Sequence, residues 1–532
     1  MLRPCAHVRL SIPFVCALVT FVTTSAYGQS APSELEKEIA AVKAENAAVR
    51  EQLRKTEEQQ KALLEKIDRL QRQLEGSAAA AVPRKGQPIA PATTAPAVAT
   101  GAFAAAANAA VQAPQPGTNA GEASAQPASA GNQRLSERYQ DGIVIWQTAN
   151  DASVPFLLKF NVNTQVRYLN TTDSDDTFTD HLGGVHDVNK RNDITVNRSM
   201  FILGGYIFDP RLRYSSTVWT SAGAASIVVA GTIGWQFSNA FTLTGGYTGI
   251  PGSRSLVNTF PFWTATDRSM ADNFFRPGFT QGIWANGEPF KGINYLVFVG
   301  NGLNTLNISA SKIDTNLMYS GSVWWEPLGD YGPPGKSRNM YDDYFASDDI
   351  RIRLGSAFTR AREDRFSDLD QSSPENTSMH NSDGVLTFAT GAFAPGVTVQ
   401  DVTYEMWAID AGVKWNGLAV NGQYYFRWLK DFLADGPLPL NSTYDHGFEL
   451  SASYFIAPKK YLVYARGSVV NGQFGDSWEY AVGAKWYPVP TERMWLIGEL
   501  MRVNKAPYSG TFTPYTSGLT GWVPMVQAIL AF

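Results

Sequence analysis

The sequence is poor in cysteine, with two in 532 residues, Cys5 and Cys16. Both fall in an N-terminal stretch in which Arg3 and Arg9 precede an apolar run at 10–24 and small residues follow this run. This order is typical of a secretory signal peptide, so we predict one at residues 1–28. An uncleaved membrane anchor is the alternative, but the apolar run is short for a span. The remaining chain then has no thiol, which excludes a disulfide scaffold and a thiolate metal site.

Long hydrophobic runs and an excess of positive charge are also missing. After residue 28 there is no stretch of about 18 apolar residues, so no transmembrane helix is predicted. The formal net charge of −4 disfavours nucleic acid as a partner. Glycine is plentiful, with 46 residues, and aromatic side chains make up 12% of the chain. Together they favour β structure with tight turns.

Residues 33–75 carry side chains at alternating spacings of four and three that form the a and d pattern of a coiled coil. The positions are Leu35, Ile39, Val42, Asn46, Val49, Leu53, Thr56, Gln60, Leu63, Ile67, Leu70 and Leu74. A helix of this length cannot bury such a stripe alone, so we predict a coiled coil with partner chains. Its mixed Ile, Leu and Val core leaves a dimer and a trimer both open. A single solvated helix is the alternative.

Residues 76–135 consist mainly of alanine, proline, glycine, glutamine and serine. Such a composition buries too little apolar surface to fold, so we predict a disordered linker. The chain is therefore expected to run from signal peptide to coiled coil, then through the linker to a barrel domain at residues 139–532.

Strands with two different faces fill this last domain. In the stretch 156–168, FLLKFNVNTQVRY, one parity is apolar apart from Thr164, and the other carries Lys, Asn, Gln and Arg. Residues 405–428 repeat the alternation on both sides of Asn416-Gly417, a dipeptide favoured in two-residue hairpin turns. Period-two alternation predicts antiparallel strands with one apolar and one polar face.

Such strands suit either a soluble sandwich, whose apolar faces pack together, or a membrane barrel, whose apolar face meets lipid. Three features favour the barrel: aromatic residues near strand ends, a polar face rich in Asn, Gln, Ser, Gly and Arg, and a last strand that ends on Phe532. We therefore predict an all-β fold, a transmembrane antiparallel β-barrel of about 16 strands preceded by the α-helical coiled coil.

A series of motifs occurs along the predicted barrel. They are an Arg-bearing strand with an Asp-Pro turn (196–214), a Gly-to-Pro loop entry (245–253), the triplet Asp267-Arg268-Ser269, a segment beginning at Arg276, an Asn-Gly loop (297–304) and a Trp-Glu-Pro element (323–327). In this order they resemble the phosphate-selective porins of the O/P type, over about residues 156–532. The resemblance implies a homotrimeric barrel in outer-membrane lipid, with the coiled coil in the periplasm, that takes up small anionic solutes.

The resemblance also implies a constriction where basic side chains replace the hydration of an anion. Arginine suits phosphate because its planar fork binds two oxygens. The candidate pore-lining, anion-binding residues are cations on the polar strand parity and three loop arginines: Lys159, Arg167, Arg198, Arg211, Arg213, Arg254, Arg268, Arg276, Arg351, Arg353, Lys414 and Arg427. Any one of them is alternatively an ordinary salt-bridged lumen residue. Residues 139–532 carry 29 Lys and Arg against 36 Asp and Glu, so a general porin is a safer prediction than a phosphate porin.

Other functions have weaker support. His181 and His186 lie near aspartates in a polar loop, but this spacing is common by chance, so no metal site is predicted. No nucleophile elbow or phosphate loop occurs, and we predict neither an enzyme nor a cofactor. The alternative is a structural role, because about 42 helical residues at 1.5 Å each would reach roughly 60 Å and tether the barrel within the envelope.

Deleting residues 33–75 tests both uses of the predicted helix. We expect the deletion to lower the thermal stability of the trimer and to weaken the cell envelope, because the helix is predicted to join chains and to span periplasm. Native gel electrophoresis of heated samples and detergent sensitivity of cells measure these effects. A deletion that changes neither would remove both proposed roles.

Overall fold

A computed structural model describes residues 139–149, 151–221, 226–303, 313, 315–332, 339–365, 379–510 and 512–532. The predicted signal peptide, coiled coil and linker lie outside these residues. The predicted barrel domain lies almost wholly within them. No helix in this part of the chain is long and apolar enough to cross a membrane.

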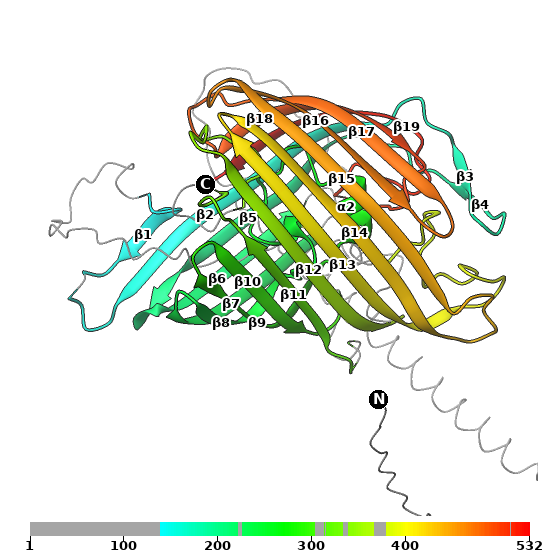
Figure 1. Ribbon diagram of the computed structural model, residues 1–532, viewed down its shortest axis with the longest axis horizontal. Coiled ribbons are helices and arrows are strands. Elements are labelled where there is room, and N and C mark those ends of the chain that lie inside the picture. The colour runs from blue at the N-terminus through cyan, green and yellow to red at the C-terminus, as the bar shows by residue number, and fades with distance from the viewer. Residues whose placement is uncertain are drawn as a thin grey trace, which may run out of the picture. The chain divides into compact units, whose positions relative to one another are not determined.

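One antiparallel sheet of seventeen strands dominates the structure (Figure 1). One of these, β1 (Ile143–Gln147), pairs only with β2, and the other sixteen form a ring. The ring consists of β2 (Phe156–Asn170), β5 (Asn192–Ile207), β6 (Asp209–Ser221), β7 (Ser226–Ser238), β8 (Phe241–Gly249), β9 (Phe279–Phe290), β10 (Ile293–Gly300), β11 (Met318–Trp325), β12 (Arg351–Asp364), β13 (Val399–Trp415), β14 (Leu418–Ala434), β15 (Ser442–Ala457), β16 (Tyr461–Asn471), β17 (Asp476–Trp486), β18 (Met494–Asn504) and β19 (Gly521–Ala531).

The last strand closes the ring onto the first. β19 pairs with β2 from Met525 opposite Leu169 to Ala531 opposite Asn163. The backbone of Phe532 then exchanges two hydrogen bonds with Val162, at 2.8 and 2.9 Å. Closure leaves no sheet edge within the ring, which a sandwich would have. The predicted all-β barrel and its strand number are therefore confirmed.

The connections at the two ends of the ring differ. At one end β13 and β14 join at Asn416-Gly417, both with positive φ, as a tight hairpin turn requires. At the other end several loops are long, and the loop after β2 forms a small hairpin of β3 (Thr177–Thr179) and β4 (Val185–Asp187). The connection from β11 to β12, residues 326–350, is an exception. It is long, although it lies at the same end as the Asn416-Gly417 turn, which we call the short-turn end.

The outer surface of the ring is apolar. Along β7 the outward side chains Ile227, Val229 and Ile233 are 70%, 71% and 67% exposed, whereas Val228 and Ala230 between them are buried. Outward aromatic side chains lie near both ends of strands, as Trp478 and Trp486 do on β17. An exposed apolar band bounded by aromatic residues is the pattern of a barrel in lipid.

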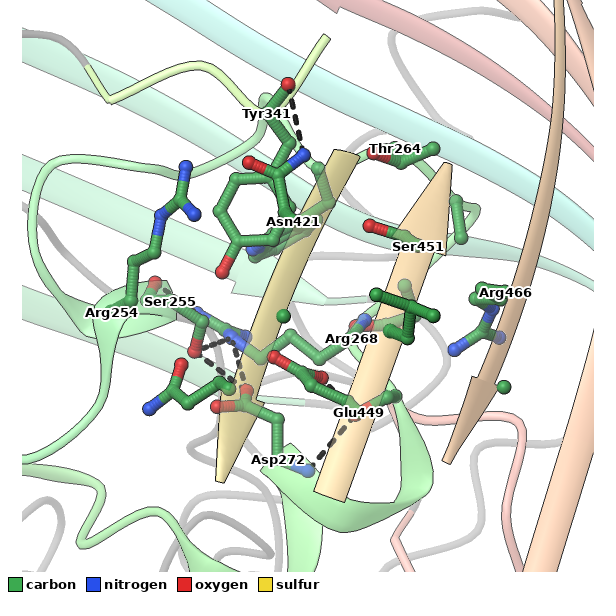
Figure 2. A pocket seen from close by; sticks show the side chains of 18 residues that line it. Arg254, Ser255, Thr264, Arg268, Asp272, Tyr341, Asn421, Glu449, Ser451 and Arg466 are labelled. Carbon is green, nitrogen blue, oxygen red and sulfur yellow. Dashed lines mark hydrogen bonds and ion pairs between the residues drawn. The ribbon is translucent and has the colours of Figure 1, made fainter. Parts of the chain in front are cut away.

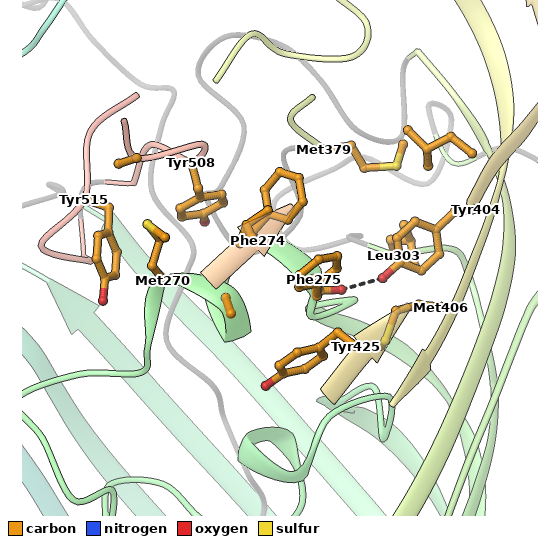
Figure 3. Packing of buried hydrophobic residues seen from close by; sticks show 14 of the residues in the cluster. Met270, Phe274, Phe275, Leu303, Met379, Tyr404, Met406, Tyr425, Tyr508 and Tyr515 are labelled. Atoms are coloured by element: carbon orange, nitrogen blue, oxygen red, sulfur yellow. Dashed lines mark hydrogen bonds between the residues drawn. The ribbon is translucent and has the colours of Figure 1, made fainter. Parts of the chain in front are cut away.

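The inner surface is polar and densely packed. Gln165 and Arg167, on the polar parity of the first ring strand, are completely buried, while the alternating residues Val166 and Tyr168 are exposed. Met270, Phe274 and Phe275 from a loop also enter the lumen and pack in a cluster that includes Tyr404 and Met406 of β13 and Tyr425 of β14 (Figure 3). The enclosed side of the ring is thus filled largely by protein.

Introducing an arginine on the outer face separates a membrane barrel from a soluble one. We expect Ile233→Arg, midway along β7, to destabilise the protein in lipid vesicles by about 2–4 kcal/mol. Phe237→Arg, on the same face near the turn, should cost about 0–1 kcal/mol. Urea titration of folding in vesicles measures both. Equal costs for the two variants would argue against a membrane-spanning β7.

Candidate functional site

The loop between β8 and β9, residues 250–278, folds into the barrel, and we call it the inserted loop. It contains a 3-10 turn, η2 (Arg254–Leu256), and a short helix, α2 (Met270–Phe275), and almost all of its residues are buried. Ser269 caps α2 by accepting a hydrogen bond from the Asp272 N–H. The helix packs on β14, β15 and β16, where the Phe275 ring stacks on Tyr425 with centroids 5.2 Å apart.

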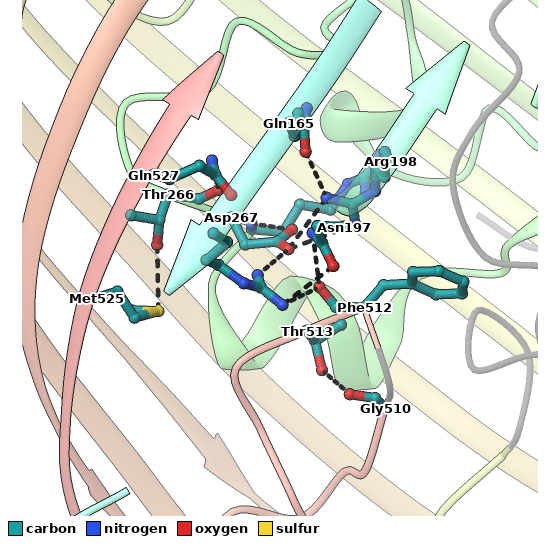
Figure 4. A network of polar contacts seen from close by, with 12 residues as sticks. Gln165, Asn197, Arg198, Thr266, Asp267, Gly510, Phe512, Thr513, Met525 and Gln527 are labelled. Carbon is teal, nitrogen blue, oxygen red and sulfur yellow. Dashed lines mark hydrogen bonds and ion pairs between the residues drawn. The ribbon is translucent and has the colours of Figure 1, made fainter. Parts of the chain in front are cut away.

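One face of the inserted loop is held by a buried carboxylate. Asp267 lies 3.3 Å from both Arg167 on β2 and Arg198 on β5, and all three side chains are fully buried (Figure 4). Arg167 also donates to the Phe512 carbonyl, at 2.7 Å, and so ties in the loop before β19. Burial raises the pKa of Asp267, but the two guanidinium groups outweigh it and lower the pKa overall. Asp267 is therefore charged at neutral pH and links three segments.

The opposite face of the inserted loop is held by acids on the wall. The backbone N–H of Met270 donates to Glu479 at 2.9 Å, and that of Thr266 donates to Glu499 at 3.1 Å. Arg466 on β16 lies between the two acids, 3.2 Å from Glu479 and 2.7 Å from Glu499. The wall acids thus have both a cation and loop N–H donors, which satisfies their buried charge.

The 326–350 connection enters the lumen from the short-turn end. Tyr331 and residues 339–344 are buried. Lys414 donates to the carbonyls of Tyr331 and Met340, at 2.7 and 2.8 Å, and Lys485 pairs with Asp342 at 2.5 Å. The lumen is therefore narrowed by segments from both ends.

A row of polar side chains crosses the wall opposite the inserted loop. Strand register places Asp410 beside Gln423, Gln423 beside Glu449, Glu449 beside Ser468, and Ser468 beside Glu479. The row is acidic, whereas the inserted loop presents arginines. Arg254 packs over the Tyr341 ring at 4.3 Å and lies 3.9 Å from Asp410. Opposite charges therefore face each other between the inserted loop and the wall.

A small cavity of about 40 Å³ lies between the inserted loop and strands β14 to β16 (Figure 2). Its lining includes Arg254, Arg268 and Asp272 from the loop and Gln423 and Glu449 from the wall. A single water needs roughly 10 to 15 Å³, so the cavity has room for a few waters or one small solute. It is the obvious candidate for a solute position.

One loop arginine lacks a partner. Arg276, the C-cap of α2, is buried, and its Nε and Nη1 have no hydrogen-bond acceptor. Within the described residues it forms no ion pair. Burial first and then the charge of Arg276 lower the pKa of Arg268 to about 9. Arg276 is thus a buried cation for which the described residues offer no counter-charge, and an anion beside its free N–H groups would be stabilised.

The twelve predicted site residues fall into three groups. Those buried with protein partners are Arg167, Arg198, Arg254, Arg268, Arg353, Lys414 and Arg427. Arg276 is buried without a partner. Lys159, Arg211, Arg213 and Arg351 lie near the short-turn end, away from the inserted loop. Arg211 in particular is exposed, pairs with Asp209 at 2.8 Å and packs over the outward-facing Trp235.

Sequence reasoning missed several residues of the constriction. Arg466 and Lys485 are buried lumen cations, and Gln423, Glu449 and Glu499 line the wall. Their positions in the strands could have identified them as lumen residues. Polar and apolar residues alternate along these strands, and each of the five lies on the polar face.

The two loop histidines do not share a site. His181 Nδ1 lies 2.5 Å from Asp383, and His186 Nε2 lies 2.8 Å from Asp180. Each histidine therefore has its own carboxylate partner and helps to hold the β3–β4 hairpin. No group of three or more metal-binding side chains occurs among the residues that the structure describes.

No protein-family model matches the chain, and no curated protein matches it. Solved structures with a similar fold include OmpT of Vibrio cholerae (TM-score 0.44, 10% identity, 72% of this chain and 99% of that chain). OmpF of Salmonella typhi has a TM-score of 0.44 and 11% identity, covering 73% of this chain and 100% of that chain. An anion-selective porin from Comamonas acidovorans has a TM-score of 0.40 and 14% identity, covering 71% of this chain and 99% of that chain. Likeness this distant identifies no family or function, so the resemblance to phosphate-selective porins stays a prediction.

Removing the charge of Asp267 tests the docking of the inserted loop. We expect Asp267→Asn to destabilise the protein by about 3–5 kcal/mol, because Arg167 and Arg198 then lack a buried counter-charge. Intrinsic fluorescence during thermal unfolding measures the loss. Asp176→Asn, which breaks an exposed pair with Lys190, is the control and should leave stability unchanged. A wild-type-like Asp267→Asn protein would contradict this anchor.

Proposed function

We propose that the protein is an outer-membrane porin through which small solutes diffuse passively. The observation that carries this proposal is the closed sixteen-strand ring with an apolar exterior and a polar, charged interior. Such an arrangement encloses polar side chains within an apolar wall, with no sheet edge or unpaired ladder exposed to lipid. The inserted loop and the 326–350 connection narrow the enclosed lumen and determine which solutes pass.

We propose further that the constriction prefers anions. The buried charged residues of the described chain number ten cations and eight acids, so net charge supplies little bias. The preference rests on Arg276, whose guanidinium is unpartnered, and on the neighbouring Arg268. Phosphate is one candidate solute, since an arginine fork binds two of its oxygens at once.

The assembly we propose is a trimer, with the predicted coiled coil in the periplasm. The heptad pattern of residues 33–75 supports an association of chains, and the number three comes from the resemblance to phosphate-selective porins.

A structural role is the second candidate, and one observation favours it. The lumen is filled from both ends, and the cavity beside the inserted loop measures about 40 Å³. A barrel that does not conduct would serve as an anchor for the periplasmic segment. Conductance therefore separates the two candidates.

Single-channel recording in planar bilayers tests the porin and its anion preference together. We expect KCl currents with a reversal potential on the anion side under a salt gradient, and a partial block by millimolar phosphate. Arg276→Gln should shift the reversal potential toward zero and raise the half-blocking phosphate concentration at least ten-fold, because the only unpartnered constriction arginine among the described residues is lost.

Arg211→Gln, at the exposed turn end, is the matched control and should behave as wild type. Currents without ion preference in the wild type would retire the anion proposal and leave a general porin. A complete lack of current would favour the structural role.

A further inference from the structure

The 326–350 connection enters the lumen and leaves it through the same end of the barrel. Its flanking residues are Trp325, where β11 ends, and Arg351, where β12 begins, and both lie at the short-turn end. The two strands pair directly with each other, so a short turn would be enough to join them. The extra length of this connection serves to place protein inside the lumen.

Polar contacts hold this connection to the barrel wall. Lys414 on β13 donates to the carbonyls of Tyr331 and Met340, at 2.7 and 2.8 Å. Lys485 on β17 pairs with Asp342 at 2.5 Å. When such a segment leaves a barrel, water enters the space and can replace hydrogen bonds and ion pairs of this kind. These contacts are therefore reversible, unlike buried pairs in a closed core.

Apolar packing favours the docked position. The Tyr344 ring lies 5.1 Å from that of Tyr487 and 5.7 Å from that of Phe455, between centroids. Met340 belongs to the same buried cluster. The connection therefore rests inside the lumen, and its displacement requires a driving force.

The inserted loop is held differently. It enters from the opposite end and is fixed on two faces, by Arg167 and Arg198 on one side and by Glu479 and Glu499 on the other. Its short helix also packs on three strands of the wall. Of the two segments that fill the lumen, the 326–350 connection is thus the one that can be withdrawn without rearranging the other loops.

The charge of the connection supplies a driving force. Residues 326–350 contain six acidic and two basic residues. Two of the acids, Asp342 and Asp343, are 4% and 3% exposed inside the barrel. A membrane potential acts on each charge that moves across it. A potential that is positive at the short-turn end therefore pulls this segment out of the lumen, and the opposite polarity holds it in.

We propose that the 326–350 connection is a plug that closes the barrel at rest and is withdrawn toward the short-turn end by a membrane potential of one polarity. This inference rests on the proposed porin function and concerns its regulation. It reconciles passive diffusion with a lumen that is filled from both ends. Solute selection at Arg276 belongs to the inserted loop and is a separate property.

An engineered disulfide tests the withdrawal, since the chain has no cysteine after Cys16. The Asn339 side chain donates to the Thr259 hydroxyl at 3.1 Å, so Asn339→Cys with Thr259→Cys ties the connection to the inserted loop without changing any charge. In planar bilayers we expect the reduced protein to carry at least five-fold more KCl current at one polarity than at the other. Oxidation should abolish this difference, and a reductant should restore it.

Ser215→Cys with Thr232→Cys is the matched control, because these hydroxyls lie 2.8 Å apart on β6 and β7, away from the connection. Its oxidation should leave the polarity difference unchanged. Thiol titration verifies that each disulfide has formed. Equal currents at both polarities in the reduced protein, or a difference that survives complete oxidation of the Asn339–Thr259 pair, would overturn the plug.

Lys414→Met provides a second test that needs no disulfide. This change removes two contacts of the connection and keeps the bulk of the side chain, so opening should begin at a lower potential than in the wild type. An unchanged opening potential would contradict the proposed anchoring of the plug.

Replacing residues 328–348 with Asn-Gly separates the plug from the porin. We expect this variant to conduct at both polarities at rest, and circular dichroism checks that its barrel has folded. A folded variant without current refutes the porin itself. Wild-type current that is equal at both polarities retains the porin and refutes the plug.

Discussion

The burial of Asp267 between Arg167 and Arg198 is the interaction on which the interior of this protein depends. The carboxylate belongs to the inserted loop and the two guanidinium groups belong to the first two strands of the ring. None of the three groups touches solvent, so each is tolerable only while the others are in place. The contact therefore sets the position of the loop and, through Arg167 and the Phe512 carbonyl, that of the segment before the closing strand.

A barrel in lipid has to hold its interior together by such contacts because its apolar residues face outward. Burial of apolar surface drives ordinary folding, but here the ring places Ile227, Val229 and Ile233 outside. The interior compensates with ion pairs, N–H donors to wall acids, and a local apolar cluster around Phe275 and Tyr425. Each wall acid beside the loop has a donor or cation, which explains how so many charges are buried in so small a space.

Strand parity made the ring predictable from sequence. Alternation in 156–168 and 405–428 depends only on neighbouring residues, and the strand number follows from repeating hairpins. The same rule put Arg167 and Arg427 on the enclosed face, where they are found. The rule failed for Arg211, which lies close to the turn where β6 begins. The pairing of β5 with β6 shifts register there, between Tyr206 and Ile207, and the Arg211 side chain bonds back to Asp209.

The partners of the lumen cations were not predictable. Arg167 and Asp267 are 100 positions apart, and Thr266 and Glu499 are 233 apart, so no local pattern joins them. Their pairing depends on how a long loop folds back into a finished ring. That arrangement is a tertiary property, and only the spatial structure reveals which cations are left over.

The charged and polar groups that have no protein partner determine which solutes a narrowed lumen can favour. The guanidinium groups that hold the loops are largely paired with carboxylates, as Arg427 is with Asp445, and Arg427 also donates to the His380 carbonyl. Selectivity therefore cannot follow from counting lumen arginines, because most of them serve the structure. In the porin that we propose, selectivity would follow from the few groups that loop docking leaves free. Arg276, for which the described residues supply no counter-charge, is such a group.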